Sequence, residues 1–269
     1  MNAGEPNTVG YLLRQWRHRR GLSQLEFACL ADVSARHISF VETGRTIPSQ
    51  AMLLRLADHL EVPLAQRNRL LVAAGYAPIF QHRDWHTAPE LAVARAAVEQ
   101  ILAGHEPFPA LVLDSRWNLL SANAGAAVFF DGVDPDLLSP PANMMRLGLH
   151  PRGFASRVGN VAQVRGRLLT RLARQVAHTG DPVLAALHDE VRGYGGDDDP
   201  AFSAEGIDDI ALPIRLRHRD HDLTFINTVT TFGTATDLTL ADVVVESYYP
   251  ADAITRDALR NLAAGRLSA

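Results

Sequence analysis

Arg36, His37 and Phe40 fall within about one helical turn of each other in the segment ARHISFVETGRTIPS, and Arg45 follows shortly after them. An arginine can donate two parallel hydrogen bonds to guanine, and an aromatic ring can rest against a thymine methyl group. An arginine beyond the end of the helix can pair with a phosphate, which sets position but carries no sequence information. These residue types at this spacing therefore favour contact with double-stranded DNA.

Two short helices joined by a tight turn are expected to position these side chains. Ser23 and Glu26 match the capping box of the first helix, and Ser34 can cap the second. Ile38 and Val41 supply the buried side of the second helix, so its charged and aromatic side chains are not needed in the core. This arrangement is a helix-turn-helix, in which the second helix lies in the major groove.

The front of the chain predicts an all-α domain of five short helices over residues 1–80. Apolar residues with helical spacing mark the first helix, namely Val9, Leu12, Leu13 and Trp16. The front domain contains nine arginines and six carboxylates, a net charge of +3, whereas the remainder of the chain carries −7. A basic domain ahead of an acidic one indicates a polyanionic partner for the first. The alternative is that arginines on a small helical bundle simply form a solvated face.

The segment GLSQLEFACLADVSARHISFVETGRTIPS resembles the DNA-binding domain of the Xre/phage-repressor family, across about residues 8–75. The resemblance implies recognition residues at Ala35, Arg36 and Phe40, and an ion pair between Glu42 and Arg17. With the flanking and capping positions, the expected DNA-contacting residues are Gln24, Ser34, Ala35, Arg36, His37, Ser39, Phe40, Thr43 and Arg45. Members of that family often carry glutamine at the recognition positions, so the operator sequence does not follow from the resemblance.

A second domain is expected over residues 89–269, after a linker at residues 81–88 with polar residues and broken periodicity. A helix, two strand-like runs, a set of helices, three further strand-like runs and a final helix succeed one another. The expected elements include helix Pro89 to Gly104, strands PALVLDS and WNLLSAN, helices Val161 to His178 and Pro182 to Val191, strands IALPIRLRH, DLTFINTVTTFG and LTLADVVVESYYP, and helix Ala253 to Gly265. This order predicts an α+β domain in which helices pack on one side of an antiparallel sheet.

Three segments of this domain, PALVLDSRWNLLSAN, NMMRLGLHPRGF and FINTVTTFGTATDLTLADVVVESYYPAD, resemble the ligand-binding domain of MmyB-like transcription regulators. The resemblance covers about residues 89–262 and implies a PAS-like sensor domain paired with a helix-turn-helix. It also implies a fatty-acid-like ligand, since the sensor of that family has been associated with such molecules. The expectation is a sequence-specific DNA-binding transcription regulator that senses a small apolar ligand.

A fatty chain requires an apolar cavity, and its carboxylate requires one or two hydrogen-bond donors at the mouth. Methionine suits a flexible alkyl tail because its side chain adapts its shape. The expected cavity residues are Phe129, Phe130, Met144, Met145, Phe225 and Tyr248, with His150 and Arg152 as donors. The alternative for the apolar residues is an ordinary core, and Arg152 can equally pair with a carboxylate of the protein. No cofactor other than such a lipid is predicted.

Two other functions stay open on the sequence alone. The rear domain can serve only to dimerise or to dock a protein partner, with no ligand. The third class is an enzyme, but the sequence contains no G-x-S-x-G, P-loop or H-E-x-x-H pattern. A metal site is not predicted, because His82 and His86 lack a third ligand nearby and the residues of HRDHD suit a hairpin turn.

The cytoplasm is the expected compartment. The single cysteine, Cys29, cannot form an internal disulfide, and the first residues lack the layout of a signal peptide. No apolar run is long enough to cross a bilayer, so no membrane contact is expected. A homodimer on two DNA half-sites is expected, as in other helix-turn-helix proteins, with the helix after Pro89 as a candidate dimer element.

Overall fold

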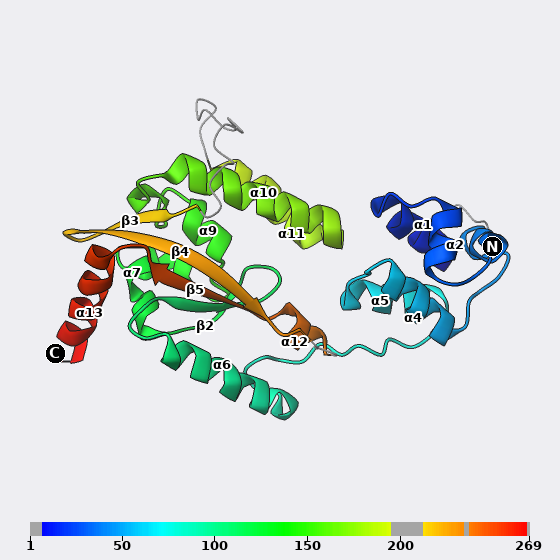
Figure 1. The fold of residues 1–269 in the computed structure, drawn as a ribbon, viewed down its shortest axis with the longest axis horizontal. Coiled ribbons are helices and arrows are strands. Elements are labelled where there is room, and N and C mark those ends of the chain that lie inside the picture. The colour runs from blue at the N-terminus through cyan, green and yellow to red at the C-terminus, as the bar shows by residue number, and fades with distance from the viewer. Residues whose placement is uncertain (1–6, 195–211, 234–236, 268–269) are drawn as a thin grey trace. The chain divides into compact units, whose positions relative to one another are not determined.

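The computed structural model describes residues 7–194, 212–233 and 237–267. The chain divides into two compact units, with the main boundary between His82 and Arg83 (Figure 1). Each unit has a hydrophobic core of its own, and each is described separately below.

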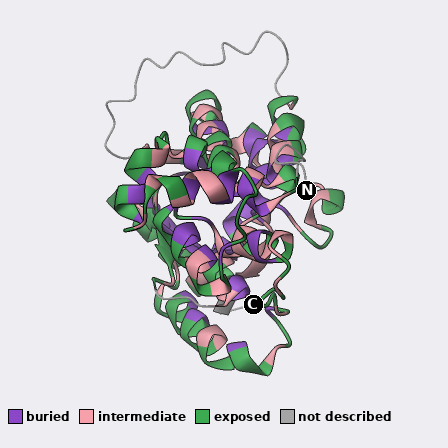
Figure 2. Ribbon diagram, turned by 90° about the vertical axis from the view of Figure 1, so that its right-hand side faces the viewer, coloured by how far each residue is buried: buried purple, intermediate pink, exposed green. Residues whose placement is uncertain are grey.

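The described part of the first unit contains five α-helices, which confirms the expected all-α helix-turn-helix domain. They are α1 (Val9–Arg19), α2 (Gln24–Leu30), α3 (Ala35–Glu42), α4 (Gln50–His59) and α5 (Leu64–Ala73). The core gathers one apolar stripe from each helix, and Leu13, Phe27, Ile38 and Leu56 are almost fully buried in it. Figure 2 shows these buried stripes as purple bands beside exposed green ones, as an amphipathic helix requires.

Side-chain caps define where the helices of the first unit begin. Ser23 accepts a hydrogen bond from the Glu26 amide, and the Glu26 carboxylate accepts one from the Ser23 amide, so the capping box is confirmed. Ser34 caps α3 by accepting from the His37 amide at 3.1 Å. Each cap satisfies an amide that has no partner within its helix, which fixes where the helix starts.

The second unit is built on a five-stranded antiparallel sheet with strand order β2-β1-β5-β4-β3. The strands are β1 (Ala110–Leu113), β2 (Leu119–Ala122), β3 (Ile214–His218), β4 (His221–Thr231) and β5 (Val244–Pro250). The last strand of the sequence pairs with the first, so β5 lies at the centre between β1 and β4. This confirms the expected α+β class with an antiparallel sheet.

Helices cover both faces of this sheet. They are η1 (Pro89–Leu91), α6 (Ala92–Gly104), η2 (Ala124–Ala126), α7 (Ala127–Phe130), α8 (Pro135–Leu138), α9 (Met144–Leu149), η3 (Ala155–Arg157), α10 (Val161–Thr179), α11 (Pro182–Arg192), α12 (Leu238–Asp242) and α13 (Ala253–Leu267). Figure 1 shows α9, α10 and α11 on one face of the sheet and α6 on the other. Alternate side chains of β1 lie on opposite faces of the sheet. Leu111 and Leu113 join the core under α9 and α10, whereas Val112 packs toward α6.

Two expectations about the second unit are corrected. The segment LTLADVVVESYYP was expected to be one strand, but Leu238–Asp242 forms the helix α12 and β5 begins only at Val244. The reason is that the β-branched run, which favours extended structure, starts at Val243. The sheet is also covered on both faces, rather than on one.

Trp85, expected in the linker, is buried with Val98 and Val245 in the small core beneath α6. The first two residues of the run IALPIRLRH lie outside the described residues.

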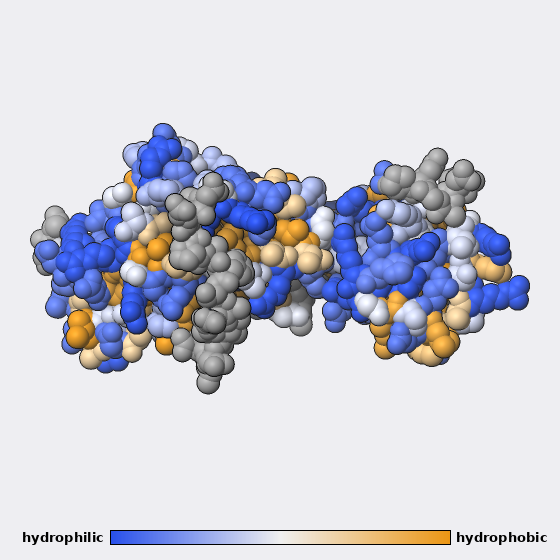
Figure 3. Space-filling view, turned by 90° about the horizontal axis from the view of Figure 1, so that it is seen from above, coloured by the Kyte–Doolittle hydropathy of each residue, from blue (hydrophilic) through white to orange (hydrophobic). Residues whose placement is uncertain are grey.

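Among the residues that the structure describes, no helix combines the length and apolarity needed to span a membrane. Figure 3 shows apolar patches on both units that are interrupted by hydrophilic surface.

Candidate nucleic-acid interface and ligand cavity

Helix α3 is held in place by a buried ion pair. The Arg17 guanidinium donates two hydrogen bonds to Glu42, one from Nε at 2.7 Å and one from Nη2 at 2.9 Å, and both residues are 5% exposed. Arg17 Nη1 also donates to the carbonyl of Leu22, and Gln24 donates to the second carboxylate oxygen of Glu42. The expected pairing is confirmed. Removing one partner of such a pair leaves an uncompensated buried charge and costs about 3–5 kcal/mol.

The inner and outer sides of α3 differ as the sequence indicated. Ile38 and Val41 are each 1% exposed and belong to the core, whereas the side chain of Arg36 is exposed. Phe40 is half-buried, with the Arg36 guanidinium 5.1 Å and the Arg45 guanidinium 5.4 Å from its ring. Both distances fall within the range of a cation–π contact. The outer side of α3 therefore presents a stacked cluster of two arginines around one aromatic ring.

The other expected DNA-contacting residues have varied surroundings. Ala35 is half-buried and packs against the core, and His37 is half-buried with no hydrogen-bond partner for its Nε2 among the described residues. Thr43 is exposed at the end of α3, where its hydroxyl donates to the carbonyl of Ser39. Gln24 is half-buried because its amide is engaged with Glu42. Among the described residues near α3, Arg36 and Arg45 are therefore the exposed ones whose charged groups have no carboxylate partner.

A cavity of about 340 Å³ lies in the second unit between the sheet and helices α9 and α10. Its walls come from α9, α10, β3, β4, β5 and the segments around residues 117, 129 and 154–158. The lining is Trp117, Phe129, Met144, Met145, Gly148, Phe154, Val158, Val164, Arg167, Leu168, Arg171, Leu212, Ile214, Ile226, Asn227, Val229, Glu246 and Tyr248. Small-molecule sites commonly hold about 300–1,000 Å³ and are mostly apolar with a few polar groups, so this cavity suits a small ligand.

The cavity lining includes a polar cluster around Glu246. Arg171 on α10 donates to one oxygen of the Glu246 carboxylate at 2.7 Å, and the Tyr248 hydroxyl donates to the other at 2.9 Å. Glu246 is only 4% exposed, and the Arg171 guanidinium lies 4.3 Å from the ring of Trp117. Burial, together with the neighbouring carboxylate, raises the pKa of the Tyr248 phenol well above its ordinary value. Tyr248 therefore remains a hydrogen-bond donor at every physiological pH.

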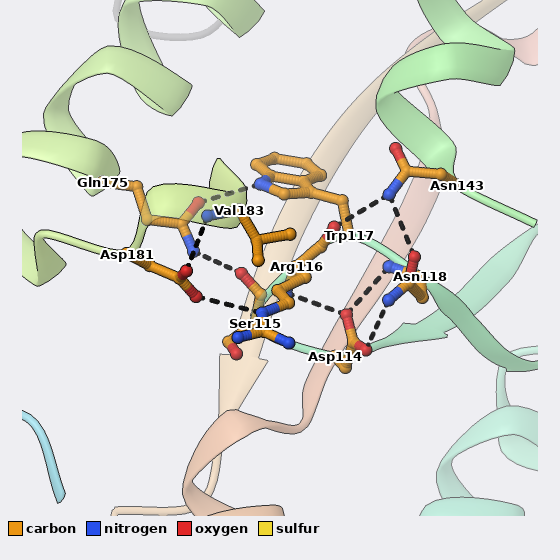
Figure 4. Close-up of polar contacts among 9 residues, drawn as sticks. All are labelled: Asp114, Ser115, Arg116, Trp117, Asn118, Asn143, Gln175, Asp181 and Val183. Carbon is orange, nitrogen blue, oxygen red and sulfur yellow. Dashed lines mark hydrogen bonds and ion pairs between the residues drawn. The ribbon is translucent and has the colours of Figure 1, made fainter. Parts of the chain in front are cut away.

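The turn between β1 and β2 positions Trp117, which has a left-handed backbone with φ of 69°. Asp114 stabilises this turn by accepting hydrogen bonds from the amides of Arg116 and Asn118 at 2.8 and 2.9 Å. The Trp117 indole then donates to Gln175 of α10 at 2.8 Å, and Gln175 in turn donates to the carbonyl of Ser115. Figure 4 shows this network, which ties the hairpin to α10 and holds one wall of the cavity.

The same network reaches the start of two helices. Asn143, the N-cap of α9, donates to the Arg116 carbonyl at 2.8 Å and to Asn118 at 3.1 Å. Asp181, the N-cap of α11, accepts from the Arg116 side chain at 3.0 Å and from the Val183 amide at 2.8 Å (Figure 4). The turn thus fixes the elements that surround the cavity on this side.

Four of the expected cavity residues line the cavity, namely Phe129, Met144, Met145 and Tyr248. Phe225 is fully buried behind them, with its ring 5.7 Å from that of Phe129, and Phe130 packs partly buried against the same core. For these last two residues the alternative of an ordinary core side chain describes their surroundings better.

The structure does not bring His150 and Arg152 to this cavity, which corrects the expected donors. Arg152 pairs with Asp134 at 2.6 Å, and His150 Nδ1 accepts from the Arg152 amide at 3.0 Å while its ring packs edge-on against Tyr194. The turn after α9 directs both side chains away from the apolar walls. The cationic groups that line the cavity are Arg167 and Arg171 instead.

Sequence reasoning missed Trp117, Arg171 and Glu246 as cavity residues. A signal existed for Glu246, because strand alternation places it on the same face as Tyr248, two residues later. Helical spacing likewise places Arg167 and Arg171 on one side of α10. Which face of each element meets the cavity depends on strand order, which the sequence does not state.

The described part of the chain holds no group of three or more histidine, cysteine or acidic side chains that could bind a metal ion. The histidines at 82, 86, 218 and 221, considered as metal ligands above, therefore form no such site there. His218 lies 3.8 Å from the carboxylate of Asp131, which the Arg219 side chain also contacts at 3.1 Å.

Comparison with known protein families identifies both units. The model of the MmyB-like transcription regulator ligand binding domain matches residues 94–262, and a helix-turn-helix domain model matches residues 8–70. None of the curated proteins compared with the chain matches it. The chain is also similar, at 11% identity and a TM-score of 0.25, to a solved structure described as "Structure of an RNA-binding Light-Oxygen-Voltage Receptor". That match covers 97% of this chain and 64% of the other, and its TM-score is too low to support a conclusion.

Proposed function

The chain belongs to the family of MmyB-like transcription regulators. We propose that a small ligand in the cavity of the second unit changes how tightly the first unit binds DNA. The chain is a regulator with a DNA-binding helix-turn-helix and a ligand-binding domain. We propose that it acts through these two binding events rather than as an enzyme, with residues 1–80, 81–88 and 89–269 as DNA-binding domain, linker and sensor domain. The order of the strands supports a PAS-like description of the sensor.

The observation that carries the DNA-binding part is the outward cluster on a rigidly held helix. The Arg17–Glu42 pair and the apolar residues Ile38 and Val41 anchor α3, so the Arg36 side chain projects from a fixed backbone. Such a helix enters the major groove with its exposed side toward the base edges. We propose Arg36 and Phe40 as the base-reading residues, and Arg45 as a phosphate contact. A homodimer on two half-sites is part of this proposal.

The remaining members of the expected interface have supporting roles in this proposal. Ser34 caps the start of α3, His37 lies in its first turn, and Ser39 and Thr43 lie toward its end. Ala35 brings the backbone close to the duplex because its side chain is small, and Gln24 supports α3 from the start of α2 through its hydrogen bond to Glu42.

The cavity supports the sensing part, with a small apolar molecule such as a fatty acid as the proposed ligand. Met144, Met145 and Phe129 form an adaptable apolar wall, and Arg167 supplies positive charge in the cavity lining. A ligand changes DNA affinity only if it binds one conformation or one dimer geometry of the protein more tightly than another.

The test is native mass spectrometry of the full chain combined with DNA-binding measurements. A lipid-sized mass bound to the purified protein, together with an operator affinity that changes when the lipid is removed, is the expected result. A protein that binds its operator equally well with and without lipid would contradict sensing. It would favour the alternative in which the second unit only dimerises or docks a protein partner.

A further inference from the structure

We propose that Glu246 makes the cavity selective for acids that carry a hydroxyl group close to the carboxylate, over plain fatty acids of equal length. This inference rests on the proposed function, because it assumes that the cavity binds an amphiphilic ligand. It goes further by assigning the ligand a second polar group and by naming the residue that recognises it.

The Glu246 carboxylate is a built polar feature of a mostly apolar cavity. It is 4% exposed, it lines the cavity, and Arg171 and Tyr248 each occupy one acceptor position on its two oxygens. A carboxylate offers about four acceptor positions, so each oxygen can still accept one more hydrogen bond. The groups already bound to Glu246 are both donors, and they come from α10 and from β5 itself. A ligand that approaches Glu246 therefore meets an acceptor surface.

A plain fatty acid fits this acceptor surface poorly. Two carboxylates that share a weakly solvated site repel each other, and one of them must take up a proton or move away. Arg171 already balances the charge of Glu246 at 2.7 Å, so it has little positive charge left for a second carboxylate. A neutral hydroxyl has no such cost, and a hydrogen bond from it to the charged Glu246 is of the stronger kind.

The acid group of the ligand has a separate partner. Arg167 lies four residues before Arg171 on α10, which places it about 6 Å along the same side of the helix. It lines the same cavity, is exposed, and makes no ion pair with any carboxylate in the described part of the chain. One turn of α10 separates the two arginines, so we propose a ligand that places its carboxylate at Arg167 and its hydroxyl at Glu246 and carries these groups a few covalent bonds apart, as in a β-hydroxy acid. The alkyl chain then lies against the methionine and phenylalanine wall.

The experiment is calorimetric titration of the full chain, freed of lipid, with dodecanoic acid and with β-hydroxydodecanoic acid below their micelle concentrations. We expect the hydroxy acid to bind at least about tenfold more tightly, the ratio that a hydrogen bond to a charged group contributes. In E246Q the preference should shrink to about twofold or less, because the negative charge that repels the plain acid is gone. In R167Q both acids should weaken together, since both lose the same carboxylate partner.

The matched control is E190Q. Glu190 also pairs with an arginine, Arg146, at 2.7 Å, but it does not line the cavity, so this variant should keep the full preference. Equal binding of the two acids to the wild-type protein would overturn the inference while leaving ligand sensing intact. A preference that persists in E246Q would overturn the role of Glu246. If neither acid binds, and no lipid accompanies the protein from cells, the proposed sensing function itself fails.

Discussion

Phe40 contacts two guanidinium groups, which gives this residue a role of its own in the proposed recognition surface. Arg36 and Arg45 are separated by nine positions in the sequence, yet both lie within 5.4 Å of the same ring. A flexible arginine loses rotamer entropy when it binds DNA. Stacking on a ring restricts the side chain before binding, so the entropy cost of binding is smaller. The ring therefore orders two side chains in advance, whether or not it also touches a base.

We predict that Phe40→Leu weakens operator binding about fivefold to thirtyfold, because two cation–π contacts of about 0.5–1 kcal/mol each are lost. Phe40→Tyr keeps the ring and should bind within about threefold of the wild type. The measurement is a double-mutant cycle with Arg36→Ala, at fixed salt. Strictly additive losses in the two variants would show that Phe40 acts independently of Arg36, for instance through a thymine methyl group alone.

His218 gives the second unit a dependence of stability on pH. Burial lowers the pKa of this histidine despite the opposing effect of the Asp131 carboxylate, so the folded protein favours the neutral ring. A histidine in the unfolded chain titrates near pH 6.5. As the pH falls below this value the unfolded chain takes up the proton first, so the free energy of unfolding decreases until the pKa of the folded state is also passed.

We predict that His218→Phe becomes progressively more stable than the wild type as the pH falls from about 7.5 to about 5.5. Urea unfolding at several pH values measures the difference. Substitution of the exposed His86 by phenylalanine is the control, since its ring is not enclosed. The account of His218 is contradicted if the two variants differ from the wild type by the same amount throughout this range.

At the scale of elements, the position of α3 depends on how closely α1 approaches it. A Cβ atom at Gly10 would lie 2.3 Å from the carbonyl oxygen of Val41 and 2.8 Å from that of Glu42. No side chain fits this gap, and backbone carbonyls cannot rotate away as a side chain can. Apolar spacing predicts which side of α3 packs inward, but it gives no sign that α1 approaches α3 this closely at Gly10.

We therefore predict that Gly10→Ala destabilises the first unit by about 1–3 kcal/mol, as overpacking does, and weakens DNA binding by displacing α3. Gly166→Ala provides the contrast. Gly166 lies inside α10 with open space around its Cβ position, so alanine there should stabilise the second unit by about 0.5–1 kcal/mol. Hydrogen exchange of amides in α1, α3 and α10 measures both effects. A Gly10→Ala variant as stable as the wild type would refute the close approach.

Across the whole molecule, sequence patterns predicted the features that depend on residues close together in the chain. Caps such as Ser23 and Ser34 and the apolar spacing of α1 and α3 depend on residues a few positions apart, and those expectations are confirmed. The composition of the cavity depends on pairings across more than a hundred residues, such as Leu111 of β1 with Glu246 of β5. His150 and Arg152 were therefore placed at the cavity by sequence proximity to α9, whereas Arg171 and Glu246 reach it through tertiary packing.

The linker illustrates the same limit. Its polar residues and broken periodicity predict a region without long helices, but they do not predict that Trp85 is buried in the apolar gap between α6 and β5. Only the arrangement of the sheet reveals that gap.

In the proposed function, the exposed side of α3 recognises the DNA sequence. The most direct measurement is selection of bound sequences from random DNA by the wild-type chain and by Arg36→Ala, at one salt concentration. The account predicts enriched half-sites spaced about 10–10.5 base pairs apart for the wild type, and loss of preference at one base position of each half-site for the variant. Identical enriched sequences from both proteins, or no enrichment by the wild type, would contradict it.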